Sequence, residues 1–131
     1  MESFHHIGPG PHGDRSTVIF KGGRFEGPRL RGTIMAGGGD WEIVKDTREP
    51  EWDNECGEGE EGWRQTAYLD TRYNLQTHDG VVIYLRTTGT RTGRKRVLER
   101  LGDGGIGAEE YVMRLHLTFE CGDERYAWLN Q

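Results

Sequence analysis

The sequence contains little cysteine and no long apolar run, and each shortage excludes a class of protein. Cys56 and Cys121 are the two cysteines among 131 residues. They are too few and too far apart to define a disulfide framework or a zinc site. No stretch approaches the roughly 20 apolar residues that a membrane helix needs, and the N-terminus lacks the apolar core of a signal peptide. We therefore expect a cytoplasmic protein with free thiols and no membrane association.

Positive charge is also scarce, with 17 Lys and Arg against 22 Asp and Glu and a net charge of -5. Residues 40–61 hold ten acidic and two basic residues, a net of -8, which leaves +3 for the rest of the chain. The short basic cluster at 91–96 is interpreted as a solvated turn, because nucleic-acid binding requires a denser stripe of Lys and Arg. We expect no nucleic-acid partner.

Glycine, by contrast, is abundant: 21 residues are glycine, and the hydrophobic share is 33%. This composition favours a turn-rich β protein over a helical bundle, and the length is sufficient for one core. We expect a flexible N-terminal arm over 1–14, then a single domain over 15–131 with an acidic loop insertion at 46–62. His5, His6 and His12 in the arm have no carboxylate or cysteine at ligand spacing, so we expect no metal.

Residues 67–88 predict the central β-hairpin, because two runs rich in β-branched and aromatic residues flank Asp79-Gly80. A three-residue turn with Gly80 in the left-handed conformation pairs Leu75 with Ile83 and Tyr73 with Leu85. This register divides the hairpin into two faces. The apolar face holds Leu69, Tyr73, Leu75, Val81, Ile83 and Leu85, and the polar face holds Asp70, Arg72, Asn74, Tyr84 and Arg86.

Shorter patterns predict the other elements. Strands are expected at 16–21 and 41–44, and a third over 24–35 is interrupted at Gly27-Pro28, where proline cannot donate a ladder bond. The glycines at 37–39 fit neither phosphate-binding pattern and are interpreted as a strand connection. Residues 90–93 are interpreted as a turn. Residues 94–101 have helical spacing and a glycine stop, so we expect a short helix capping one end of the sheet. Residues 111–120 alternate as a strand whose apolar face holds Tyr111, Met113, Leu115, Leu117 and Phe119.

Several of these stretches together resemble a microbial domain-of-unknown-function family of small lipocalin-like β-barrels. The matching pieces are G-G-R-F-E-G-P-R-L-R-G (22–32), G-G-G-D-W (37–41), L-D-T-R-Y-N-L-Q-T-H-D-G-V-V-I-Y (69–84), E-Y-V-M-R (110–114) and F-E-C-G-D-E-R-Y-A-W-L-N (119–130). The resemblance implies an antiparallel barrel and no organic cofactor. Together with the helix expected at 94–101, it gives the predicted fold class: all-β, a small lipocalin-like antiparallel barrel with one short helix.

The chain departs from the family pattern at both ends. Members usually have a strand before the segment at Ser16 and one or two strands after the Trp-Leu-Asn motif. A barrel without its terminal strands has unpaired edges, which proteins normally cover or pair. We therefore expect the chain to close its sheet with its own N-terminal arm or with a partner subunit, as a homodimer.

Polar residues matching the family motifs are the candidate site, at one mouth of the barrel. Asp40 or Glu120 in an apolar mouth would have a raised pKa suited to acid-base catalysis. Tyr84 and Arg114 could stabilise an enolate or phenolate, and Arg72 facing Arg86 would need a carboxylate between them, from Asp70, Asp40 or Glu120. The expected ligand-binding residues are Trp41, Arg72, Tyr73, Arg86, Trp128 and Asn130. The alternative is that the polar residues are solvated surface and the aromatic residues pack in the core.

Three functions remain open at this point. The first is binding of a small molecule with cofactor-free isomerase, cyclase or dehydratase chemistry on a phenolic or polyketide-like metabolite. The second is a carrier that binds such a ligand without reaction. The third is a structural or interaction protein that pairs its open sheet edges with a partner.

Overall fold

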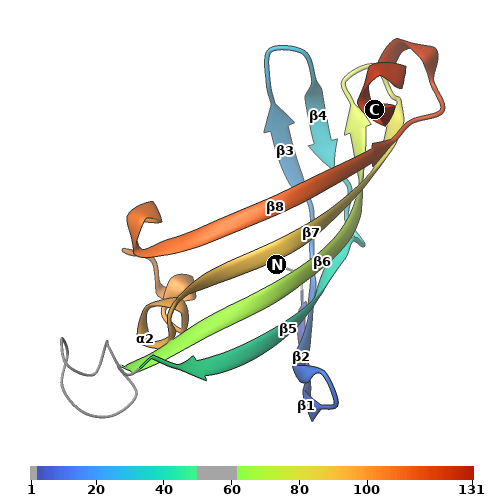
Figure 1. Cartoon of the computed structure of the whole chain (residues 1–131). Coiled ribbons are helices and arrows are strands. Elements are labelled where there is room, and N and C mark those ends of the chain that lie inside the picture. The colour runs from blue at the N-terminus through green and yellow to red at the C-terminus, as the bar shows by residue number, and fades with distance from the viewer. Residues whose placement is uncertain (1–2, 50–61) are drawn as a thin grey trace.

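One strongly curved antiparallel sheet makes up most of the computed structural model, which describes residues 3–49 and 62–131 (Figure 1). Its eight strands among these residues are β1 (Ser3–Gly10), β2 (Gly13–Ile19), β3 (Gly23–Glu26), β4 (Arg31–Ile34), β5 (Gly39–Arg48), β6 (Trp63–Thr77), β7 (Val82–Arg94) and β8 (Tyr111–Glu120). The sheet curls into a half-barrel, which confirms the expected all-β antiparallel fold.

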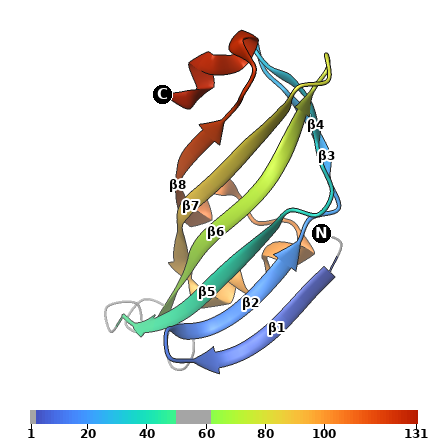
Figure 2. The same cartoon turned by 90° about the vertical axis from the view of Figure 1, so that its right-hand side faces the viewer.

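The strand order explains the shape. Strands β1, β2, β5, β6, β7 and β8 lie side by side in that order (Figure 2). Strand β4 pairs with residues 75–77 at the end of β6, on the same side of β6 that pairs with β5 over residues 63–72. Strand β3 pairs with β4. The β3–β4 hairpin therefore extends the sheet at one end (Figure 1).

The β6–β7 hairpin has the predicted register. Leu75 pairs with Ile83 and Tyr73 with Leu85, and Gly80 has a φ of 90° in the turn. A side chain at Gly89, further along β7, would collide with the carbonyl oxygen of Arg114 on β8. Glycine therefore permits the close approach of β7 and β8 at this point.

The hydrophobic core lies at the end of the half-barrel where this hairpin turns. Its buried members are Leu75, Val81, Ile83, Leu85, Tyr126 and Leu129. The last two come from the 3-10 helix η4 (Glu124–Asn130), whose Tyr126 hydroxyl donates a 2.8 Å hydrogen bond to Asp79 in the turn. Helix η4 and the β3–β4 hairpin thus fill this end of the concave face, and the described residues leave the middle of that face open.

Several sequence-based expectations need correction. Residues 3–10 form β1 and pair with β2, so the prediction of a loose arm was wrong there; the strand exists because β2 supplies a hydrogen-bonding partner. Gly27-Pro28 lies in the turn between β3 and β4, where the missing proline N–H breaks no ladder bond. Residues 90–93, predicted as a turn, continue β7.

The predicted helix at 94–101 is shorter than expected. Helix α2 (Lys95–Leu98) follows β7 directly, and two 3-10 turns, η2 (Leu101–Asp103) and η3 (Ala108–Glu110), lead to β8. The acidic insertion expected at 46–62 begins within β5, and its residues 50–61 lie outside the described residues. Among the described residues, no helix is long and apolar enough to cross a bilayer.

Candidate functional site

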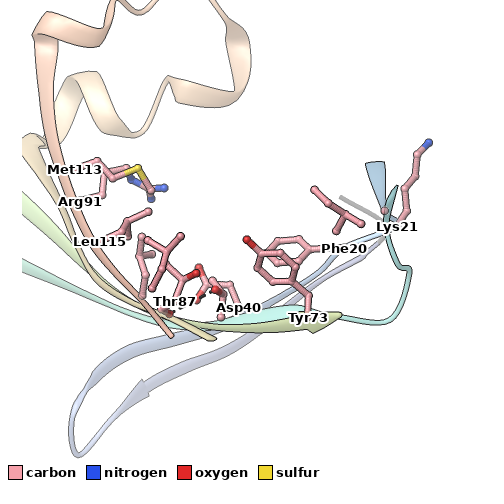
Figure 3. A pocket seen from close by; sticks show the side chains of 13 residues that line it. Phe20, Lys21, Asp40, Tyr73, Thr87, Arg91, Met113 and Leu115 are labelled. Atoms are coloured by element: carbon pink, nitrogen blue, oxygen red, sulfur yellow. Dashed lines mark hydrogen bonds between the residues drawn. The ribbon is translucent and has the colours of Figure 1, made fainter. Parts of the chain in front are cut away.

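A cavity of about 410 Å³ opens on the concave face of the sheet (Figure 3). Strands β5 to β8 form its floor and one wall, and the residues after β2 form the opposite wall. Its lining includes Phe20, Lys21, Ile34, Asp40, Leu69, Thr71, Tyr73, Thr87, Arg91, Met113, Leu115 and Leu117. Most of these side chains are apolar, so the few polar groups among them determine what the cavity can recognise.

Asp40 is the buried carboxyl of this cavity, with 7% of its surface exposed. It faces inward because it pairs with Thr71, another lining residue. The backbone pairing of β5 with β6 includes Asp40 and Thr71, is interrupted at the next two positions, and resumes at Ile43 and Tyr68. Within the gap, the Asp70 backbone N–H donates to the Asp40 Oδ1 at 3.0 Å. The side chain of Asp40 thus replaces a backbone acceptor, which holds the carboxyl in a fixed orientation.

Burial raises the pKa of Asp40 above its usual 3.8, because the charged form loses hydration. The hydrogen bond from Asp70 and the positive charge of Arg91 oppose this rise in pKa, and the Asp70 carboxylate adds to it. The pKa of Glu42, two residues along β5, is raised as well, again mainly by burial. Asp40 is therefore a carboxyl that can hold a proton at a higher pH than an exposed aspartate.

Arg91 is the cation shared by these two acids. Its Nη2 lies 3.8 Å from the Glu42 Oε2, and its charge lowers the pKa of both carboxyls. Among the described residues, the Arg91 Nε and the Thr87 Oγ1 are buried without a hydrogen-bond partner. Buried polar groups are normally paired. The polar end of the cavity therefore has hydrogen-bonding capacity that the described protein groups do not use.

Aromatic side chains form the opposite end of the cavity. The rings of Phe20 and Tyr73 meet edge to face, with centroids 5.7 Å apart, and Lys21 lies beyond them (Figure 3). On β8, Met113, Leu115 and Leu117 complete the apolar lining. The cavity thus has aromatic and apolar walls, and Asp40, Thr87 and Arg91 are polar groups among its lining residues.

The structure divides the predicted site residues between different places. Asp40 and Tyr73 line the cavity, whereas Tyr84, Arg86, Arg114 and Glu120 alternate onto the convex face with Arg72 and Trp41. Trp41, Arg72 and Tyr84 line a separate depression of about 320 Å³. Asp40 and Glu120 therefore do not form one acid-base pair.

On the convex face, Asp70 supplies the carboxylate expected between the two facing arginines. The Arg86 guanidinium donates to both Asp70 oxygens at 3.1 and 3.3 Å, and the Arg72 Nη2 lies 3.8 Å from Asp70 Oδ2. Hydrogen bonding to Asp70 raises the pKa of Arg86. Asp70 thus occupies the place between the two arginines, and the group of three side chains keeps a net charge of +1.

The last two predicted ligand-binding residues have contacts within η4 and its neighbours. The Arg29 guanidinium lies 3.8 Å from the ring centroid of Trp128, a cation-π contact. The Asn130 side chain accepts from the Cys121 N–H and donates to the Cys121 carbonyl, at 2.7 and 2.9 Å. Both side chains thus hold η4 against neighbouring segments, the β3–β4 turn and the residue after β8.

Three polar residues of the site were missed by the sequence reasoning. Glu42 follows Asp40 by two positions, so strand alternation alone could have placed both acids on one face. Thr87 and Arg91 continue the inward series of Ile83 and Leu85 along β7. The alternation of side chains was visible in the sequence. Because residues 90–93 were interpreted as a turn, Arg91 was not assigned to the inward face of β7.

Comparison with known proteins gives consistent results for the whole chain. A family model described as "Protein of unknown function (DUF3237)" matches residues 1–131. A UPF0311 protein from Rhodopseudomonas palustris is 28% identical over 120 residues, covering 91% of this chain and 67% of the relative. One from Clostridium acetobutylicum is 26% identical over 118 residues, covering 89% of this chain and 64% of the relative. The chain thus spans about two thirds of the length of these relatives.

Solved structures share the fold. A beta-barrel like protein from Acinetobacter baumannii AYE superimposes with a TM-score of 0.67 at 32% identity, over 98% of this chain and 73% of the other. A protein of unknown function from Rhodopseudomonas palustris gives a TM-score of 0.76 at 24% identity, over 97% of this chain and 73% of the other. Such similarity establishes the fold, and function has to be argued from the site.

Proposed function

This chain belongs to the DUF3237 family of proteins of unknown function, and we propose that its concave cavity binds a small, mostly apolar molecule whose polar group reaches Asp40. The observation that carries the proposal is a buried, oriented carboxyl in a cavity with mainly apolar walls. The cavity volume of about 410 Å³ lies in the range of small-molecule sites.

The walls favour an aromatic ligand of the phenolic or polyketide-like class. The edge-to-face pair of Phe20 and Tyr73 offers a surface on which a flat ring can pack. A ring hydroxyl or carbonyl at the other end can exchange a hydrogen bond with Asp40, in either protonation state of the carboxyl. Charged groups on the ligand are disfavoured there unless they meet Arg91.

Asp40 further supports proton-transfer chemistry within the same site. The carboxylate can take a proton from a carbon next to a ligand carbonyl, which leaves an enolate whose oxygen Arg91 stabilises. Return of that proton from Asp40 to a different ligand atom completes an isomerisation with no net gain or loss of protons or electrons. Burial shifts the pKa of Asp40 upward, which is the direction that favours proton exchange by a carboxyl group.

Binding is tested by titrating a panel of phenolic and hydroxy-aromatic compounds into the wild type, Asp40→Asn, Tyr73→Leu and Glu120→Gln. We expect Asp40→Asn and Tyr73→Leu to weaken binding about tenfold, because each removes a cavity contact. Glu120→Gln is the matched control on the convex face and should bind as the wild type does. Loss of binding in Glu120→Gln alone would move the site to the convex face.

Catalysis is separated from simple binding by proton NMR of a bound compound in deuterated water. An enzyme should speed exchange of the ligand's acidic C–H protons in the wild type and lose that acceleration in Asp40→Asn. A carrier would bind the same compound without accelerating exchange. That outcome would remove the proton-transfer step and leave the binding proposal intact.

A further inference from the structure

Strand β8 is an apolar edge strand in the described part of the chain. Met113, Leu115 and Leu117 on its concave face are between 42% and 48% exposed. β8 pairs with β7 on one side, and its other side pairs with no described strand. A long, exposed apolar edge of this kind is a template for strand pairing.

The backbone groups available at this edge follow from the ladder. The Thr77 N–H donates to the Val81 carbonyl, so odd-numbered residues of β7 direct their backbone groups to β6. Even-numbered residues of β7 therefore bond to the even-numbered residues of β8, since Tyr84 pairs with Glu120 and Thr90 with Arg114. The N–H and C=O groups of Leu115, Leu117 and Phe119 consequently point to the open side.

The opposite edge of the sheet is less suited to pairing. Strand β1 contains Pro9, which has no N–H, and its register shifts between His6 and Gly8. Proline and bulges are devices that protect an edge from pairing. β8 contains neither proline nor glycine, and its register against β7 runs without interruption.

We propose that β8 pairs antiparallel with β8 of a second copy of this chain, with Leu117 opposite Leu117 on the twofold axis. This register places Leu115 opposite Phe119 in hydrogen-bonded pairs. Arg114 then lies opposite Glu120 of the second copy, in the non-hydrogen-bonded position where side chains approach most closely. Symmetry repeats that ion pair on both sides of the axis.

Charge complementarity selects this register over its neighbours. Among the described residues, Arg114 and Glu120 have no ion pair within the chain, so both are available to a partner. A shift by two in one direction places His116 opposite itself and Arg114 opposite Thr118. A shift by two in the other direction places Arg114 opposite Gly122, which lies beyond the end of β8 in the second copy. The proposed register pairs both charges.

The C-terminal end of β8 coincides with the end of the proposed pairing. The next residue with outward backbone groups is Cys121, and the Asn130 side chain already bonds its N–H and C=O. The open edge therefore stops at Phe119, which is the last hydrogen-bonded residue that the proposed pairing needs.

The test is the oligomeric state and its response to charge reversal. Sedimentation of the wild type should give twice the chain mass of 14.9 kDa. Arg114→Glu and Glu120→Arg should each raise the dimer dissociation constant about tenfold, since each places like charges opposite each other. The double variant restores opposite charges, and we expect its dissociation constant within about threefold of the wild type.

Arg24→Glu, a charge reversal at an exposed position on β3, is the control and should leave the dimer unchanged. In the dimer, the amides of Leu115, Leu117 and Phe119 should exchange slowly with solvent. A protein that stays monomeric at its highest soluble concentration would overturn the proposal. So would a dimer that tolerates both single reversals, or a double variant that fails to recover. None of these outcomes bears on ligand binding at Asp40, which is measured separately.

Discussion

Asp40 shows how a single residue acquires chemical character from its surroundings. The same carboxyl on the convex face would be hydrated, as Asp70 is between its two arginines. On the concave face, burial raises the pKa of Asp40, and a backbone N–H fixes one of its oxygens. Two aspartates 30 positions apart thus differ in role because of the face on which each lies.

The raised pKa of Asp40 predicts a particular pH dependence of stability. The folded state holds this proton more tightly than the unfolded state, so the stabilisation is complete below pH 3.8 and is lost as pH rises through the folded-state pKa. Asp40→Asn removes this loss. We therefore expect the free energy of unfolding of the variant, relative to that of the wild type, to increase with pH across this range and to stay constant above it.

Urea unfolding at a series of pH values measures this difference. Asp103→Asn, at an exposed position in η2, is the control and should follow the wild-type profile. A residual slope is expected in Asp40→Asn, because burial also raises the pKa of Glu42. A constant difference between Asp40→Asn and the wild type at every pH would contradict the assignment.

At the scale of elements, the β6–β7 hairpin is the one that the others depend on. It contributes Leu75, Val81, Ile83 and Leu85 to the core and most of the cavity floor. Its turn is tied to η4 through Asp79, which accepts from Tyr126 and pairs with Arg125 at 2.9 Å. These two contacts join residues that are 46 and 47 positions apart in the sequence. Hydrogen bonds from Thr77 and Tyr126 are the main causes that lower the pKa of Asp79.

Substitution of two neighbouring residues in β7 should change the free energy of unfolding by very different amounts. Ile83 is fully buried, so Ile83→Ala should lower the free energy of unfolding by about 3 kcal/mol through lost burial and a cavity. Val82 is 49% exposed, and Val82→Ala should change it by less than about 0.5 kcal/mol. Chemical denaturation of both variants checks this contrast. Equal losses would mean that β7 does not bury its odd-numbered face.

At the scale of the whole molecule, the half-barrel has an open concave face and, besides the short edge at β3, two long edges of different character. The β1 edge carries proline and a register shift, whereas the β8 edge is regular and apolar. The sheet thus combines a ligand cavity with one edge suited to a partner. Relatives that share this fold are longer than this chain, since it covers 73% of two solved neighbours.

Self-association through β8 predicts that thermal stability depends on protein concentration. Dimerisation stabilises the folded state by mass action, so the unfolding midpoint should rise as the protein is concentrated. Differential scanning calorimetry over a wide concentration range measures this. Arg114→Glu should flatten the dependence, whereas Arg24→Glu should keep it. A wild-type midpoint independent of concentration would argue against association in this range.

Part of the fold and site could be predicted because it depends on neighbours in sequence. Alternation and the Asp-Gly turn determined the register of the β6–β7 hairpin and its two faces. Alternation in residues 111–120 likewise predicted β8 and the face that carries Leu115 and Leu117. Asp40 and Tyr73 were expected in the site, and they line the cavity.

The remaining features were decided by tertiary contacts. Residues 3–10 have weak local strand preference and become β1 because β2 offers a hydrogen-bonding edge. Asp40 and Glu120 look alike as acids within strands, yet the register of β5 against β6 turns Asp40 inward, and that of β8 against β7 turns Glu120 outward. The sequence alone determined which residues share a strand face, because that depends on a period of two. Only the tertiary structure decided which faces enclose the cavity, because that depends on how distant strands pair and curl.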